Sequence, residues 1–138
     1  VELESRFEVY AEQYVLSIEV EAKLVVDMAK TLIYPAAVDY LSTLASTGAD
    51  LSAMGVELDN SAAKTVAEQA NAMMAAVGKL SAVLDQAGFA STEEHMQFCA
   101  TEICGLMDEV RVAADALEAD VSDELWPLPK YQEMLFIK

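Results

Sequence analysis

Basic residues are scarce in this sequence. Its 138 residues include 8 lysine and arginine residues against 24 aspartate and glutamate residues, a formal net charge of -16. A surface this acidic repels phosphate backbones and anionic lipid, so we expect no nucleic-acid partner and no membrane partner. No apolar run approaches the roughly 20 residues that a membrane-spanning helix needs. A basic-then-apolar secretion signal at the start is also lacking.

Glycine and proline are few as well, at 5 and 3 residues, whereas 54% of the residues are hydrophobic. This balance excludes disordered, collagen-like and low-complexity chains, and the length suits one acidic globular domain. The sequence opens without an initiator methionine. We therefore expect a processed product or a piece of a longer polypeptide.

The residues of common active sites are thinly represented. The single histidine, His95, has Thr92 three positions before it, so the Glu-x-x-His pair of a di-metal bundle is missing. No glycine-rich phosphate loop occurs, and no base is placed to activate a serine or cysteine. We predict that the chain alone is not an enzyme and has no catalytic, cofactor-binding or metal residue. A metal-dependent bundle enzyme is the weakest hypothesis that stays open, and His95 is expected on the surface.

The only two cysteines, Cys99 and Cys104, are five positions apart. On an α-helix this spacing separates them by about 140°, so they cannot form a disulfide within it. Thiols in an apolar helical pattern are typical of small buried side chains, with a metal or redox role as the alternative. Free thiols favour a reducing, cytoplasmic compartment.

The first long helix is predicted from residue 3 to about residue 46. Pro35 lies inside it and must remove a backbone hydrogen bond, so we expect a kink near residues 31–33. Gly48 is predicted to end the helix, and residues 47–60 to form a connection with at most a short helical turn. The apolar stripe, with steps of three and four, is Leu3, Phe7, Tyr10, Tyr14, Ile18, Ala22, Val25, Ala29, Leu32, Ala36, Tyr40 and Leu44.

A second helix is predicted over residues 61–87. It carries a heptad-like seam, many alanines and few charges, which indicates the most enclosed helix of the domain. Asn60 or Ser61 can cap its start, and Gly88 is placed to close its end in the left-handed conformation.

The third helix has the strongest start signal. Ser91 and Glu94 form a capping box, in which each side chain binds the backbone amide of the other. The acidic run over residues 101–125 is interpreted as a solvated face, with a docking surface for a basic patch as the alternative. Pro127 and Pro129 are predicted to stop the helix.

These elements predict an all-α fold, an antiparallel bundle of three long helices over residues 1–125. An extended apolar tail follows over residues 126–138. The tail is too apolar for a disordered segment, so it must bury against the bundle or against a partner missing from this chain. The first helix is longer than the others, and its overhang is expected to be covered by the tail or by a second subunit.

Both ends of the chain resemble a known family. Residues 4–10 (ESRFEVY) and the tail from residue 125 to 136 (LWPLPKYQEMLF) are similar to segments of the type III glutamine synthetases. The tail resembles the carboxyl terminus of that family, whereas residues 47–90 resemble nothing specific. The resemblance implies a cytoplasmic subunit of a double-ring homo-oligomer. Such a subunit joins ammonia to glutamate with ATP and divalent ions such as Mg or Mn, bound upstream of this region.

The resemblance implies a non-catalytic, carboxyl-terminal helical domain that braces the parent subunit or builds oligomer contacts. Its partners would be the rest of the parent subunit and the neighbouring subunits. No catalytic, ATP or metal residue is carried over to this chain. The alternative is a stand-alone helical adaptor or sensor that binds a partner helix or small ligand. The candidate packing and interface anchors are Trp126, Leu128, Tyr131, Leu135 and Phe136.

Overall fold

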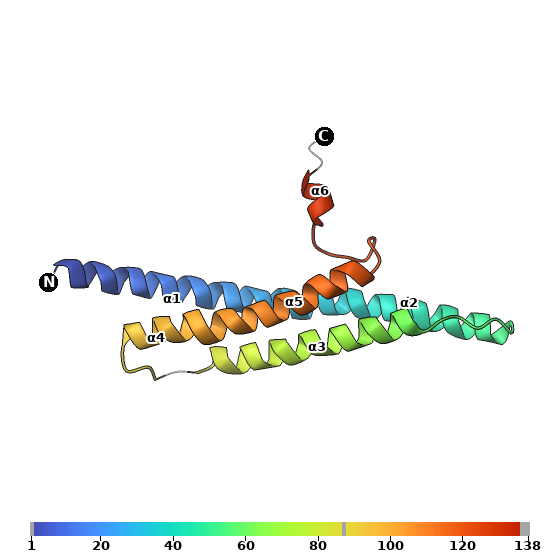
Figure 1. The fold of residues 1–138 in the computed structure, drawn as a ribbon, viewed down its shortest axis with the longest axis horizontal. Coiled ribbons are helices and arrows are strands. Elements are labelled where there is room, and N and C mark those ends of the chain that lie inside the picture. The colour runs from blue at the N-terminus through green and yellow to red at the C-terminus, as the bar shows by residue number, and fades with distance from the viewer. Residues whose placement is uncertain (1, 87, 136–138) are drawn as a thin grey trace.

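The computed structural model of the chain describes residues 2–86 and 88–135. Every regular element in these ranges is a helix, so the predicted all-α class is confirmed. Figure 1 shows long helical rods side by side, and a short C-terminal helix that leaves them. The second rod runs back along the first, and the third runs forward again.

The first rod is helical without a break from Glu2 to Ala53. It consists of α1 (Glu2–Met28), the π-helical turn η1 (Ala29–Ile33) and α2 (Tyr34–Ala53). The Tyr34 amide donates to the Ala29 carbonyl, five residues back, immediately before Pro35. Because proline has no amide hydrogen and crowds the carbonyl four residues earlier, the wider turn accommodates it. The π-helical turn therefore lies where the kink was predicted.

The predicted end of this rod at Gly48 is wrong. Gly48 lies within α2, which continues to Ala53. The helix ends in a Schellman motif, in which Gly55 donates to the Ser52 carbonyl and Val56 to the Leu51 carbonyl. Gly55 has a φ of 80°, a conformation that glycine adopts without steric cost. The second of the two glycines thus ends the helix, and the connection is shorter than predicted.

The second rod, α3 (Ser61–Leu84), is started by a residue that the prediction did not name. Neither Asn60 nor Ser61 caps it through a side chain; instead Asp59 Oδ1 accepts from the Ser61 amide at 2.9 Å. This bond is the main reason that the pKa of Asp59 is lowered. The helix ends at Leu84, and Gly88, with a φ of 95°, lies in the following connection rather than at the helix end.

The third rod comprises α4 (Thr92–Phe98), the π-helical turn η2 (Cys99–Ile103) and α5 (Cys104–Asp120). As predicted, the Ser91 hydroxyl accepts from the Glu94 amide, at 3.2 Å. The Glu94 carboxylate accepts from the Ala90 amide at 2.8 Å, one residue before the predicted partner. The rod ends at Asp120, well before the two prolines that were predicted to stop it.

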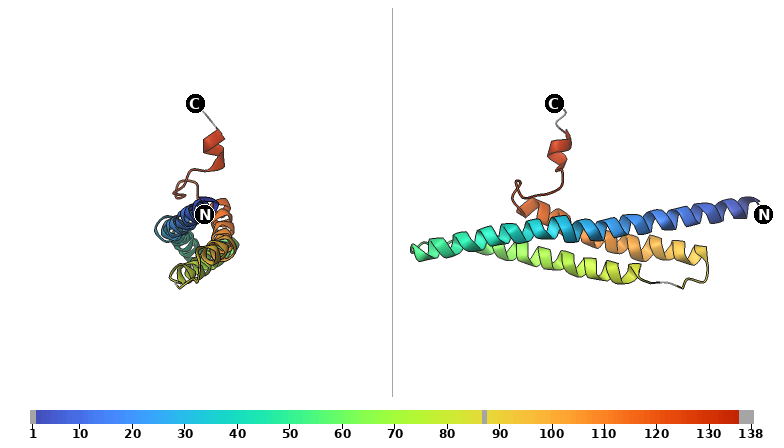
Figure 2. Two further views of the ribbon diagram at one scale, coloured as in Figure 1. Left: turned by 90° about the vertical axis from the view of Figure 1, so that its left-hand side faces the viewer. Right: turned by 180° about the vertical axis from the view of Figure 1, so that it is seen from behind.

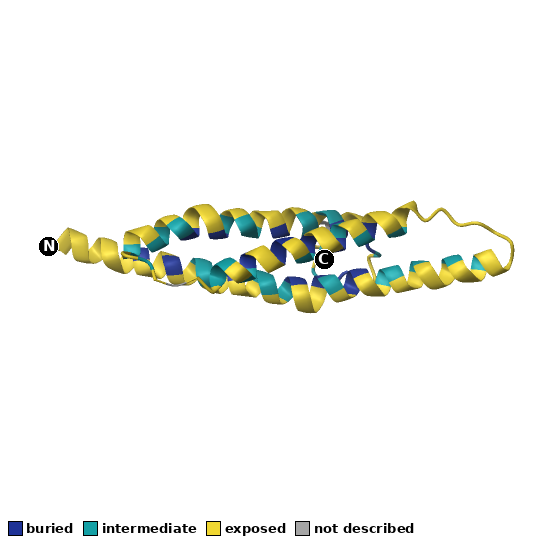
Figure 3. Cartoon of the chain, turned by 90° about the horizontal axis from the view of Figure 1, so that it is seen from below, coloured by how far each residue is buried: buried dark blue, intermediate teal, exposed yellow. Residues whose placement is uncertain are grey.

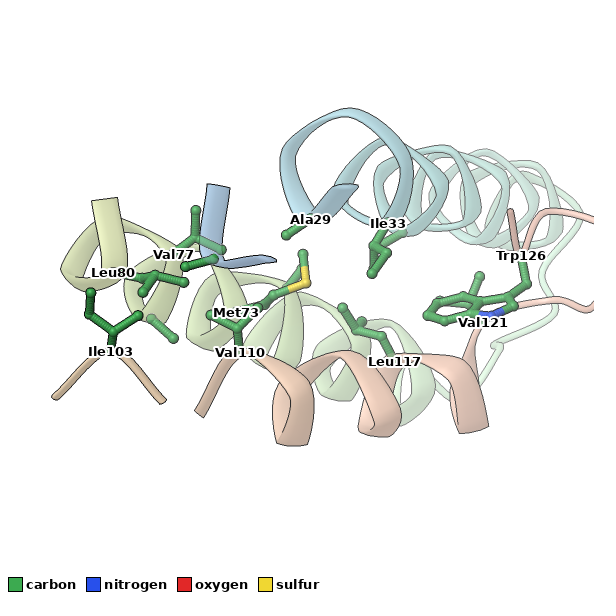
Figure 4. Close-up of a cluster of buried hydrophobic side chains, with 14 of the residues drawn as sticks. Ala29, Ile33, Met73, Val77, Leu80, Ile103, Val110, Leu117, Val121 and Trp126 are labelled. Atoms are coloured by element: carbon green, nitrogen blue, oxygen red, sulfur yellow. The ribbon is translucent and has the colours of Figure 1, made fainter. Parts of the chain in front are cut away.

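The core lies where the three rods overlap. The views in Figures 2 and 3 show a long, narrow molecule in which buried residues gather in the middle of its length. The largest of the side chains with almost no exposed surface come from α3, η2 and α5, and buried alanines of the first rod pack against them (Figure 4). Small alanine side chains let the rods approach closely. The largest of the fully buried side chains are Met73, Leu80, Ile103, Leu117, Val66 and Val77.

Candidate functional site

The first half of the C-terminal tail folds back onto the bundle. Val121 leaves the helical conformation with a φ of -77° and a ψ of 143°. The Ser122 carbonyl then accepts from the amides of Leu125 and Trp126, at 3.0 and 3.1 Å. This tight turn returns the Trp126 ring to the core, where it lies beside Val121 (Figure 4) and is only 8% exposed.

The second half of the tail leaves the bundle. Lys130 Nζ lies 2.8 Å from Asp123 Oδ1, and the Lys130 amide donates to Glu133 Oε2 at 3.2 Å. These contacts lie at the start of α6 (Tyr131–Leu135), which projects away from the rods in Figures 1 and 2. Leu135 on this helix is 74% exposed.

The five predicted anchors thus fall into different surroundings. Trp126 is buried in the core, and Leu128 packs half-buried against it, whereas Leu135 points to solvent. The side chain of Tyr131 and the whole of Phe136 lie outside the described residues. The role of the five as interface anchors stays a prediction.

The N-terminal part of α1 extends beyond the start of α4 (Figure 1). Leu3 is 84% and Tyr10 is 70% exposed, although both belong to the predicted apolar stripe. Together with Phe7 they line an open groove whose other wall is residues 91–93. The described part of the tail lies elsewhere, so it does not cover this overhang.

Sequence reasoning missed a second apolar surface on α1. Val9, Leu16, Val20 and Leu24 are each more than half exposed, on residues that the predicted stripe did not include. Their spacing of seven, four and four residues is itself helical, and it is the sequence signal that could have identified them.

His95 is not the surface residue that the sequence predicted. Its side chain is only 27% exposed, and its Nε2 lies 3.0 Å from Glu19 Oε1 on α1. The ring stacks on Phe89 with a centroid distance of 4.1 Å. His95 therefore joins the connection before α4 to the first rod, which is a packing role.

The two cysteines are free thiols on neighbouring turns of the third rod. Cys99 is completely buried, as the prediction of a small buried side chain required, and Cys104 is half-buried. Burial is the main cause that raises the pKa of the Cys99 thiol, and the Glu19 carboxylate adds to it. A thiol that stays protonated is a weak nucleophile, which favours packing over catalysis.

Within residues 2–86 and 88–135, no three His, Cys, Asp or Glu side chains cluster as a metal site requires. The described residues do not fit the divalent ions implied by the family resemblance. Nor does any helix in these ranges have the length and apolar character to cross a membrane.

Comparison with known proteins shows which proteins the chain is similar to. Residues 1–52, a range that includes nearly all of the first rod (Glu2–Ala53), match the model of the glutamine synthetase C-terminal domain. A type-3 glutamine synthetase of Dictyostelium discoideum is 34% identical over 147 residues, an alignment that covers all of this chain. The chain is homologous to the C-terminal part of type-3 glutamine synthetases. The resemblance recognised at its two ends is thereby confirmed.

A glutamine synthetase of Bacteroides fragilis is similar over nearly the same extent, with 27% identity over 146 residues and 99% of this chain. The chain spans about a fifth of the length of both relatives, since each alignment covers 20% of the relative. These alignments also include the middle of the chain, which resembled nothing specific when the sequence was read alone.

Proposed function

We propose that this chain is the non-catalytic C-terminal helical domain of a type III glutamine synthetase. In this proposal residues 1–125 form an antiparallel bundle of three long helices, and residues 126–138 form a docking tail. The domain braces the parent subunit or builds contacts between subunits of a ring-shaped, cytoplasmic homo-oligomer. The parent is then an ATP-dependent glutamate–ammonia ligase that binds its nucleotide and Mg or Mn ions upstream of this region.

The observation that carries this proposal is the surface of α6. This helix projects from the bundle (Figure 1) and presents Met134 and Leu135, which are 60% and 74% exposed. Large apolar side chains that gather on a projecting element are typical of contact surfaces, because water leaves them without packing partners. Trp126 and Leu128 fix the base of the tail to the core, so the bundle holds α6 in place for a contact.

The test is a charge placed on α6 in the full-length polypeptide. Leu135→Glu leaves the folded bundle intact, because the side chain makes little contact with it. A buried interface does not tolerate an unpaired carboxylate. We therefore expect a smaller assembly in size-exclusion chromatography with light scattering, or a lower melting temperature of the parent subunit, together with less glutamine formation.

The matched control is Val112→Glu, at a residue on α5 that is 70% exposed. It introduces the same charge into the same domain away from the tail, and it is expected to behave like the unmodified protein. If Leu135→Glu also keeps the assembly, the melting temperature and the activity of the unmodified protein, the tail is not a docking element.

A further inference from the structure

The α1 helix is apolar on two opposite sides. Its inner side consists of residues buried against the other rods, such as Ala11 and Ala22. Its outer stripe, as we call it, consists of Val9, Leu16, Val20 and Leu24, whose exposed fractions lie between 52% and 62%. At about 100° per residue these four side chains fall within about 80° of one another, on the side of the helix away from the bundle.

The outer stripe is also free of charge along most of its length. At the same helical spacing, only Gln13 shares its arc between Val9 and Leu24, Ser17 and Lys23 flank the arc on its two edges, and Asp27 follows where the stripe ends. In a chain with 24 acidic residues, a solvated helix face would be expected to carry charge here. Burial of this stripe would need no charged group to leave water.

We infer that the outer stripe docks onto the preceding part of the same polypeptide. This inference rests on the proposed function. The relatives align with this chain over only 20% of their length, and the family match is to a C-terminal domain, so most of such a subunit precedes residue 1. That upstream chain joins the domain at the start of α1, within three helical turns of Val9.

This connection favours the upstream chain over any other occupant. A surface tethered by a short stretch of chain is present at a high effective concentration, so the upstream part reaches α1 before a free partner does. The family match over residues 1–52 coincides with the rod that carries the stripe and excludes α3, α5 and the tail. The first rod is thus packed on both sides, by the bundle on the inner side and by the upstream domain on the outer side.

The test uses the full-length polypeptide with a photo-crosslinking benzoylphenylalanine in place of Val20. The control carries the same residue in place of Val112, which is 70% exposed on α5. After irradiation, a denaturing gel separates single-chain from doubled-chain products, and peptide mapping locates the cross-link. We expect a cross-link from position 20 to a residue upstream of this domain at single-chain mass. We expect no upstream cross-link from position 112.

Three results would overturn the inference. A doubled-chain product would place a second copy on the stripe, and a cross-link confined to residues 1–138 would place the domain's own tail there. A yield at position 20 no higher than at position 112 would show that the stripe is solvated. In each case the proposed function is judged separately. It stands if the same protein still assembles and forms glutamine. It is refuted instead if the unmodified polypeptide does neither.

As a second measurement, Val20→Glu and Val112→Glu in the full-length polypeptide are compared by thermal melting. Val20→Glu is expected to lower the melting temperature, because the carboxylate would be trapped in the docked surface, whereas Val112→Glu is expected to leave it unchanged. Equal melting temperatures for the two variants would contradict docking of the stripe.

Discussion

Trp126 links the tail to the bundle, and its replacement by alanine tests how much that link stabilises the domain. The ring is only 8% exposed and belongs to the same core cluster as Leu117 and Val121. Truncation of a buried tryptophan to alanine costs about 3–5 kcal/mol, because it loses the packing of the ring and leaves a cavity. A domain of ordinary stability unfolds with about 5–15 kcal/mol, so Trp126→Ala should remove a large part of the free energy of unfolding.

Trp126→Phe provides the matched comparison. The indole Nε1 is buried and has no hydrogen-bond partner among residues 2–86 and 88–135, a situation that costs about 1–3 kcal/mol. Phenylalanine keeps an aromatic ring but has no donor to bury, so the lost packing and the removed penalty offset each other. We expect Trp126→Phe to change the free energy of unfolding by less than about 1.5 kcal/mol.

Urea unfolding of this chain, followed by circular dichroism, measures both variants. Trp126 is the only tryptophan, so its blue-shifted fluorescence reports the burial of the ring in the unmodified chain. If Trp126→Ala lost less than about 1 kcal/mol, the ring could not be packed in the core as described. If Trp126→Phe were as unstable as Trp126→Ala, the indole N–H would have to be bonded, contrary to the structure.

Two further predictions concern titratable groups. Cys99 is completely buried and the pKa of its thiol is raised. Iodoacetamide at neutral pH should therefore label Cys104 first, and Cys99 only when the bundle unfolds. Mass spectrometry of the labelled peptides checks this order, and early labelling of Cys99 would contradict its burial. The lowered pKa of Asp59 means that its bond to the Ser61 amide is present above the ordinary value of 3.8 and is lost as the pH falls through the lower folded value. Protection of the Ser61 amide, measured relative to the exchange of an unstructured amide at the same pH, should therefore fall at low pH, and Asp59→Asn, which keeps an uncharged acceptor, should remove this dependence.

The helices were predictable because their signals are local. The spacing of apolar residues reports one helical face, and the serine and glutamate of the capping box lie within a single turn of each other. The errors arose where more than one nearby residue could start or end the same helix. Gly48 and Gly55 are equally able to end a helix, and Asp59 competes with Asn60 and Ser61 for the start of α3.

The tail shows a similar division. Its apolar composition predicted a contact, and the buried Trp126 and exposed Leu135 now separate the part that contacts the bundle from the part that does not. Composition could not show this, because the difference depends on a turn at Ser122 that reverses the chain before the prolines. The prolines were a sufficient reason for the helix to stop, but the chain left the helix earlier.

The sequence by itself determined an acidic, all-helical chain and its resemblance to type III glutamine synthetases, because net charge, helical periodicity and the terminal motifs can be read along the chain. Only the tertiary structure decided which side of α1 is buried. Both sides carry apolar residues at helical spacing, so periodicity cannot choose between them. The inner side is buried because its alanines let the rods approach closely, which leaves the larger Leu16, Val20 and Leu24 exposed on the outer stripe.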